Sequence, residues 1–104
     1  MYIENIGQEI ASRLLDLNRD GVTTQVLVRI GIPYLDADHL SFICPFEITG
    51  IGDRRLGYAV GVDAVQALQL VMLMIGAKLK YLCESNNWNL SWNDGVACDL
   101  GFPS

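Results

Sequence analysis

The sequence predicts an α+β domain in which an antiparallel sheet of about four strands packs against one long helix. Apolar residues recur at helical spacing over residues 63–84, whereas the segments before them alternate between apolar and polar residues, as strands do. Turn-forming residues separate these segments. A length of 104 residues suits one domain, so we expect a single domain over residues 1–104.

The first segment allows two interpretations. Apolar residues keep helical spacing from Ile3 to Leu17, which favours a helix. Against this, Asn18-Arg19-Asp20-Gly21 is a strong turn signal that leads directly into a strand, and residues 10–17 would then be the first arm of a hairpin. Periodicity alone favours the helix.

Residues 23–32 and 40–49 are predicted strands because apolar and polar residues alternate along both. Residues 34–39 between them are predicted to form a loop. Pro45 lies inside the second strand and has no backbone N–H to donate, so it implies an edge position or a β-bulge.

Residues 50–55 are predicted to form a turn, and residues 56–62 the next strand. Large residues alternate in this strand with the small residues Gly57, Ala59 and Gly61, and we expect the large side chains to face the helix. The opposite face is then nearly bare backbone. It reflects weak strand propensity without further meaning, or it offers a docking surface for a sheet, loop or ligand.

The helix is predicted to start at Asp63, because the side chains of Asp63 and Gln66 suit a capping box. One apolar row suits the core and consists of Val65, Leu68, Met72, Ile75, Leu79 and Leu82. A second row on a neighbouring face consists of Leu70, Leu73, Met74, Ala77 and Tyr81. One sheet cannot cover both rows. The second row therefore packs under the N-terminal segment, pairs with a second copy or binds a different protein.

We expect no membrane association, because Lys78, Lys80 and Glu84 end the apolar run before the roughly 20 residues that a membrane span requires. After the helix, residues 90–92 are predicted to add a short strand and Asn93-Asp94-Gly95 a tight turn. In the tail that follows, Leu100 and Phe102 are expected to pack into the body of the domain.

The composition limits the possible functions. Hydrophobic residues make up 51% and charged residues 18% of the chain, which excludes a disordered chain and favours an oligomer or a partner. The formal net charge of −5 disfavours nucleic-acid binding, because such proteins need clustered Lys and Arg. The first residues lack the pattern of an export signal, so we expect a cytoplasmic protein.

No motif for catalysis or metal binding stands out. Cys44, Cys83 and Cys98 are odd in number and widely spaced, which fits neither a disulfide framework nor a metal site, so we expect three buried cysteines. The cluster around His39 is interpreted as a solvated loop. Arg54 and Arg55 are expected to be solvated at a hairpin tip. We therefore expect no catalytic residue, no metal and no cofactor, and an enzyme is the less favoured interpretation.

Four segments together resemble a family of small bacterial domains of unknown function. They are Val28-Arg29-Ile30-Gly31-Ile32-Pro33, Cys44-Pro45-Phe46-Glu47-Ile48, Gly61-Val62-Asp63-Ala64-Val65-Gln66-Ala67-Leu68 and Asp99-Leu100-Gly101-Phe102-Pro103. The resemblance extends from about residue 10 to residue 103. It implies a strand over residues 10–17, which resolves the first ambiguity in favour of the hairpin, and it implies no activity or site residue.

Two functional hypotheses follow. The first is a non-enzymatic interaction module of the bacterial cytoplasm, for example antitoxin-like or immunity-like, which binds a protein partner or a second copy. Its predicted partner surface consists of Leu70, Leu73, Met74, Tyr81, Gly57, Ala59 and Gly61. The second is a small-molecule-binding protein or enzyme with a pocket between the sheet and the tail, lined by Arg29, Trp88, Trp92 and Asp99. Trp88 and Trp92 also suit closure of the core.

Overall fold

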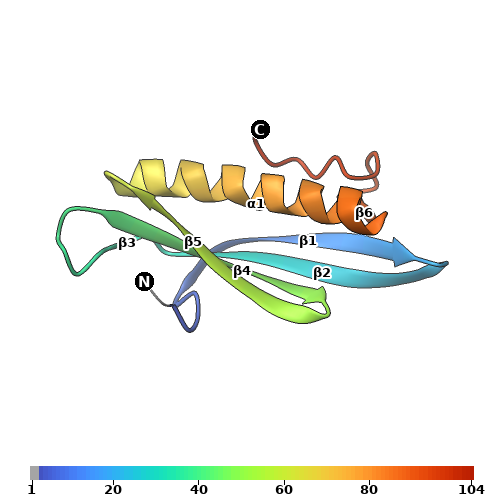
Figure 1. The fold of residues 1–104 in the computed structure, drawn as a ribbon, viewed down its shortest axis with the longest axis horizontal. Coiled ribbons are helices and arrows are strands. Elements are labelled where there is room, and N and C mark those ends of the chain that lie inside the picture. Colours follow the sequence, from blue (N-terminus) through green and yellow to red (C-terminus); the bar gives the residue numbers. More distant parts are fainter. Residues whose placement is uncertain (1–2) are drawn as a thin grey trace.

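The structure is a computed structural model that describes residues 3–104, and it consists of one antiparallel sheet with one long helix on one face (Figure 1). This confirms the predicted α+β class. The elements in chain order are β1 (Glu9–Arg19), β2 (Val22–Gly31), β3 (Tyr34–Leu35), β4 (Phe42–Ile51), β5 (Asp53–Gly61), α1 (Ala64–Asn86) and β6 (Asn89–Ser91).

The sheet is built around β4. β5 lies along one edge of β4, and β2 and the short β3 lie one after the other along its other edge. β1 pairs with β2, and β6 pairs with the last residues of β1. The long strands therefore follow the order β5-β4-β2-β1-β6.

The hairpin interpretation of the first segment is confirmed. β1 and β2 pair over their whole length, and the turn between them consists of Asp20 and Gly21, both with positive φ. A two-residue loop of this kind matches the right-handed twist of paired strands. Leu15 and Leu17 are buried, whereas Leu14 and Asp16 are exposed, so burial in β1 follows the two-residue period of a strand.

Three predictions for residues 34–55 are wrong. Tyr34 and Leu35 form β3 instead of a loop, because they pair with Phe42 and Ile43. β5 begins at Asp53, so the turn is shorter than residues 50–55; positive φ at Gly50 and Gly52 makes this tight reversal possible. Pro45 marks neither an edge strand nor a bulge. It stands opposite the gap between the end of β2 and the start of β3, where β4 has no strand to accept a hydrogen bond.

The helix begins as predicted. Asp63 Oδ1 accepts a hydrogen bond from Gln66 N, and Gln66 Oε1 accepts one from Val62 N, both at 2.7 Å. The predicted core row is partly wrong, because Val65 is exposed and Leu68 and Met72 are only half-buried. The buried row consists of Ala67, Val71, Ile75, Leu79, Leu82 and Cys83.

The orientation of β5 is opposite to the prediction. Its small residues face α1, and its large residues face the other side of the sheet. A Cβ built on Gly61 would lie 2.4 Å from Ala67 N, and one built on Gly57 would lie 2.5 Å from the Phe46 ring. The small residues therefore allow α1 and the core to approach the backbone of β5 closely.

Two irregular segments complete the domain on opposite faces of the sheet. The N-terminal segment buries Ile6 against Gly31 and Pro45, on the face away from α1. It therefore does not cover the second apolar row of the helix, and that interpretation is wrong. The tail packs beside α1, where Leu100 is buried and Phe102 lies against Gly76, as predicted.

Candidate functional site

Apart from Val65 in its first turn, four large apolar side chains of α1 are exposed, and we call these four the α1 flank. Leu70, Leu73 and Met74 are 38–40% exposed and Tyr81 is 67% exposed, whereas Val71, Ile75 and Leu79 on the core side are fully buried. These four are the helical residues of the predicted partner surface, and the structure brings them together on one element. Binding of a partner there stays a prediction.

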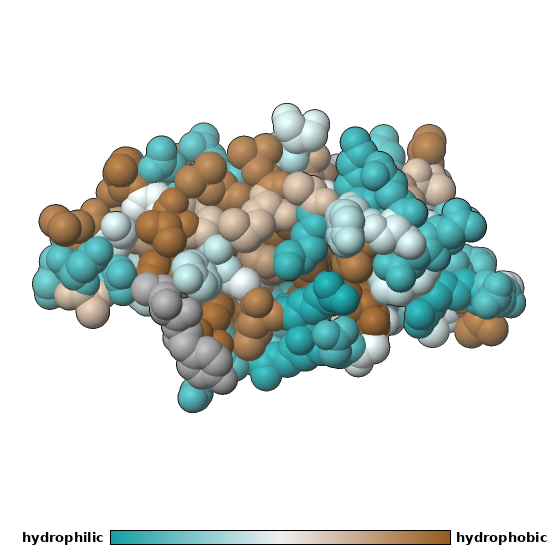
Figure 2. Space-filling view, viewed as in Figure 1, coloured by the Kyte–Doolittle hydropathy of each residue, from teal (hydrophilic) through white to brown (hydrophobic). Residues whose placement is uncertain are grey.

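Part of the α1 flank lies away from the tail, whereas Leu70 and Leu73 line a depression of about 480 Å³ together with Pro103 of the tail. Gly76 contacts Phe102, and Cys83 is bonded to Cys98, so these positions define the tail side of the helix. At 100° per residue, Met74 and Tyr81 lie on the opposite side, towards β5. Apolar side chains gather over the N-terminal half of α1, while hydrophilic ones predominate near the hairpin ends (Figure 2).

The strand residues of the predicted partner surface are not available. Ala59 is 3% exposed, and Gly61 is buried beneath the first turn of α1. Gly57 faces the Phe46 ring. The helix itself occupies the bare face of β5, so the prediction of an external docking surface at Gly57, Ala59 and Gly61 is wrong.

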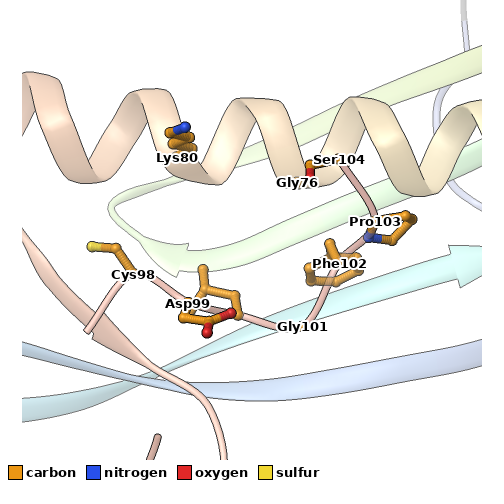
Figure 3. A pocket seen from close by; sticks show the side chains of 9 residues that line it. Gly76, Lys80, Cys98, Asp99, Gly101, Phe102, Pro103 and Ser104 are labelled. Atoms are coloured by element: carbon orange, nitrogen blue, oxygen red, sulfur yellow. The ribbon is translucent and has the colours of Figure 1, made fainter. Parts of the chain in front are cut away.

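A groove lies between the tail and α1 (Figure 3). It has a volume of about 270 Å³, and its lining consists of Gly76, Lys80 and residues 98–104. Lys80 contributes one amine, Asp99 one carboxylate and Ser104 one hydroxyl, and the other lining residues are glycine, apolar residues and the disulfide-bonded Cys98. This lining offers a cation, an anion and a hydroxyl.

The residues of the predicted ligand pocket do not converge. Arg29 lies on the face of the sheet away from α1, where it pairs with Glu9 at 2.7 Å and Glu47 at 2.8 Å. Trp88 lies under Arg19, 5.2 Å from ring centroid to guanidinium carbon. Only Trp92 and Asp99 share a depression, of about 210 Å³. The prediction of one pocket lined by Arg29, Trp88, Trp92 and Asp99 is therefore wrong.

Sequence reasoning missed a cluster of charges on the second face of the sheet. The side chain of Glu47 is charged and buried. One of its carboxylate oxygens accepts a hydrogen bond from Arg29 Nη1 and the other accepts one from Arg54 Nε. Arg54 also donates to the carbonyl of Glu4 at 2.6 Å. The Arg54 side chain is 47% exposed, as expected, but it is not free: its contact with Glu4 ties β5 to the N-terminal segment.

A second cluster that the sequence did not indicate holds the tail in place. The Arg13 guanidinium stacks on Trp92 at 3.9 Å and on Phe102 at 4.8 Å, and Arg13 Nη1 donates to the carbonyl of Leu100 at 2.9 Å. Gly101 has a φ of +76°, and a Cβ there would meet the Trp92 ring. Arg13 therefore has a structural role, fixing the tail over β1.

The cysteine prediction is partly wrong. Cys44 is a buried free cysteine, as expected, but Cys83 and Cys98 form a disulfide with a Cα–Cα distance of 6.4 Å. This bond joins the last turn of α1 to the tail. The spacing of 15 residues concealed the pair, since helix and tail come together only because β6 reverses the chain.

The loop around His39 is built by its own carboxylates. Asp38 Oδ1 accepts from Leu40 N at 2.8 Å and from Ser41 N at 3.2 Å, and Asp36 Oδ1 accepts from Ala37 N. Within residues 3–104, no group of three or more His, Cys, Asp or Glu side chains is placed to hold a metal ion. These carboxylates form turns.

The length and apolar composition of α1 alone would allow it to cross a membrane. Core helices of soluble proteins pass the same test, and one side of α1 is fully buried against the sheet. The absence of a membrane span stays a prediction.

The chain matches a known protein family. The model of a family described as a domain of unknown function, DUF6968, matches residues 11–104. No curated protein and no solved structure matches the chain. The matched region contains nearly all of β1, the α1 flank and the tail, so the family model covers both the sheet and the candidate surface.

Proposed function

We propose that this chain, which belongs to the DUF6968 family of domains of unknown function, is a non-enzymatic protein-interaction module that binds a partner through the α1 flank. The observation that carries this proposal is the contrast between the two sides of one helix. The core side is fully buried, while four large apolar side chains on the flank stay 38–67% exposed. Contiguous apolar surface of this kind is typical of interaction sites.

The spacing of the flank suits a particular mode of binding. Leu70, Leu73, Met74 and Tyr81 follow the i, i+3, i+4 and i+11 positions of one helix face. An apolar helix face recognised in a groove of another protein presents anchors at such intervals. Because α1 is fixed by the sheet, presenting these anchors costs little conformational entropy on binding.

An enzyme or small-molecule binder receives less support. The charged side chains with the shortest contacts, Arg29, Glu47 and Arg54, neutralise one another. In the groove beside Lys80, within residues 3–104, no ion pair or hydrogen bond joins the amine of Lys80 to the carboxylate of Asp99, so these groups are not held in a shared catalytic geometry. An acidic antitoxin-like or immunity-like inhibitor of the bacterial cytoplasm is one concrete form of the interaction proposal. The Cys83–Cys98 disulfide weighs against the cytoplasm, since such bonds persist mainly in oxidising compartments.

Photo-crosslinking tests the proposal. A benzophenone amino acid replaces Leu73 on the flank or, as the control, the exposed Leu40 in the loop before β4. We expect crosslinks to one defined protein from position 73 and none from position 40. The variant Met74→Glu should abolish this crosslink while leaving the far-UV CD spectrum and the melting temperature unchanged. Equal crosslinking from both positions, or none from position 73, contradicts the proposal.

A further inference from the structure

β5 is an edge strand with one side unpaired. It pairs with β4 and, among residues 3–104, with no other strand. Asp36 N donates to Ser41 O across the pair of β3 and β4, which assigns the odd residues of β4 to that side of the ladder. Backbone groups of successive residues in an antiparallel strand point to alternate sides, so the even residues of β4 form their backbone hydrogen bonds with β5. The backbone groups of Leu56, Tyr58 and Val60 then point to the open edge.

This edge lacks the features that protect edge strands from pairing. Natural edges carry Lys, Pro or a bulge in their middle. From Leu56 to Val62 the chain has no charge and no proline, and its register against β4 is continuous from Arg55 to Gly61. Val60 is 47% exposed beside this edge. The edge is therefore suited to strand addition, in which main-chain hydrogen bonds supply the contact.

The charges at the two ends of β5 are complementary to each other. Arg55 Nε is buried without a hydrogen-bond partner among the described residues, since Asp53 Oδ1 lies 3.7 Å away, beyond hydrogen-bond distance. Beyond the other end of the strand lies Asp63, which is exposed. An antiparallel copy of β5 brings the Arg55 end of one strand beside the Asp63 end of the other. A parallel copy would instead place Arg54 and Arg55 of one strand beside Arg54 and Arg55 of the other, where the like charges repel.

We propose that the open edge of β5 pairs antiparallel with β5 of a second copy, which joins the two sheets across a twofold axis. Leu56, Tyr58 and Val60 of each copy then face one another on the side of the sheet away from α1, and Arg55 of each copy gains Asp63 of the other. This interface goes beyond the proposed function, because it uses a different surface.

The oligomeric state of the purified chain tests the proposal. Light scattering after size exclusion, from micromolar to millimolar concentration, should give twice the mass of the chain. Val60→Lys on the open edge should raise the dimer dissociation constant at least about tenfold, and Arg55→Gln should raise it by about the same factor through loss of the ion pair. Two matched controls should not change the dissociation constant: Leu14→Lys on an exposed position of β1, and Lys80→Gln on the tail side of α1.

Crosslinking locates the interface. The pairing of Arg55 with Asp63 places residue 58 opposite residue 60 of the other copy. In the double variant Tyr58→Cys/Val60→Cys, oxidation should therefore trap a covalent dimer, whereas Leu14→Cys should stay monomeric on a non-reducing gel. A chain that is monomeric at millimolar concentration overturns the proposal, and so does a dimer that Met74→Glu dissociates and Val60→Lys does not. These outcomes are separate from the crosslinks of position 73 to a different protein, so the dimer and the proposed function can fail independently.

Discussion

Cys44 shows how one buried thiol links stability to pH. The thiol lies in the core and donates to the carbonyl of Gly31 at 3.6 Å, and burial raises its pKa from 9.0 to about 11. The unfolded chain keeps the lower pKa, so it loses the proton first as pH rises. The stability that the buried protonated thiol gives the fold is therefore fully present below about pH 9. Between about pH 9 and 11 the free energy of unfolding falls, by about 2 to 3 kcal/mol at most.

The substitution Cys44→Ala should remove this loss. Urea unfolding at several pH values gives the free energy of unfolding of both proteins, and the difference between wild type and variant should shrink as pH rises through this range. The two proteins differ only at residue 44, so the contributions of all other groups cancel in the comparison. A difference that stays constant with pH contradicts this account of Cys44.

Gly61 is required because the helix approaches the strand too closely for a side chain. A Cβ at this position would lie 2.4 Å from Ala67 N, and backbone cannot move away as a flexible side chain can. We expect Gly61→Ala to lower the free energy of unfolding by about 2 to 3 kcal/mol, as overpacking of a core does. Val22→Ala at an exposed strand position of β2 is the control and should cost less than about 1 kcal/mol, as surface changes usually do. An equal loss of unfolding free energy in both variants would show that the close contact between Gly61 and Ala67 does not exclude a side chain.

At the scale of elements, the face of β5 could not be read from its alternation. Large and small residues alternate in the sequence, and this pattern predicts a strand without saying which face meets the helix. The free energy gained by burying apolar surface favours large side chains facing the core, and the prediction for β5 that relied on this was wrong. The connection decides instead: only Val62 and Asp63 separate β5 from α1, so the helix starts directly above the strand and fits only against Gly61 and Ala59.

The tail depends on contacts between segments that are distant in sequence. Arg13 on β1 contacts Trp92, Leu100 and Phe102, and Cys98 N donates to the carbonyl of Leu90 at 2.6 Å. Sequence reasoning predicted that Leu100 and Phe102 pack inwards, since both are apolar. It could not predict the arginine between two aromatic rings or the disulfide, because neither has a local pattern.

The disulfide should stabilise the tail measurably. Closing a loop of this length contributes about 3 kcal/mol in the chain-entropy description. We expect Cys98→Ser to lower the free energy of unfolding by up to about that amount and to make the tail accessible to limited proteolysis near Leu100. Thiol labelling under denaturing conditions should find one free thiol in the wild type and two in the variant. Three labelled thiols in unreduced wild type would contradict the pairing.

At the scale of the whole molecule, the sheet is covered unequally on its two faces. α1 and the tail close one face over the main core, while the N-terminal segment and the ion pairs of Arg29, Glu47 and Arg54 close only part of the other. The sequence predicted the fold class and the four long strands because hydrophobic period and turn residues are local signals. It could not assign the N-terminal segment, because its helical spacing is overridden by pairing of β1 with β2 and β6.

The apolar character of α1 belongs to the fold, and this leads to a prediction about the intact chain. The side that would face lipid in a membrane span includes Val71, Ile75 and Leu79, and these are fully buried by the sheet. Exposing them to lipid requires unfolding the core. We therefore expect the folded chain to stay at the bottom of a density gradient in a liposome flotation assay, with neutral or anionic lipid.

A peptide of residues 62–88 provides the positive control for this assay. It carries the same apolar residues without the sheet, so it should float with the vesicles. The intact Met74→Glu variant should stay at the bottom of the gradient, as we expect of the intact wild type. Flotation of the folded wild type that Met74→Glu abolishes would mean that lipid, and not a protein, is what the α1 flank binds. Flotation of neither chain nor peptide would show that α1 is too polar for lipid even without its sheet.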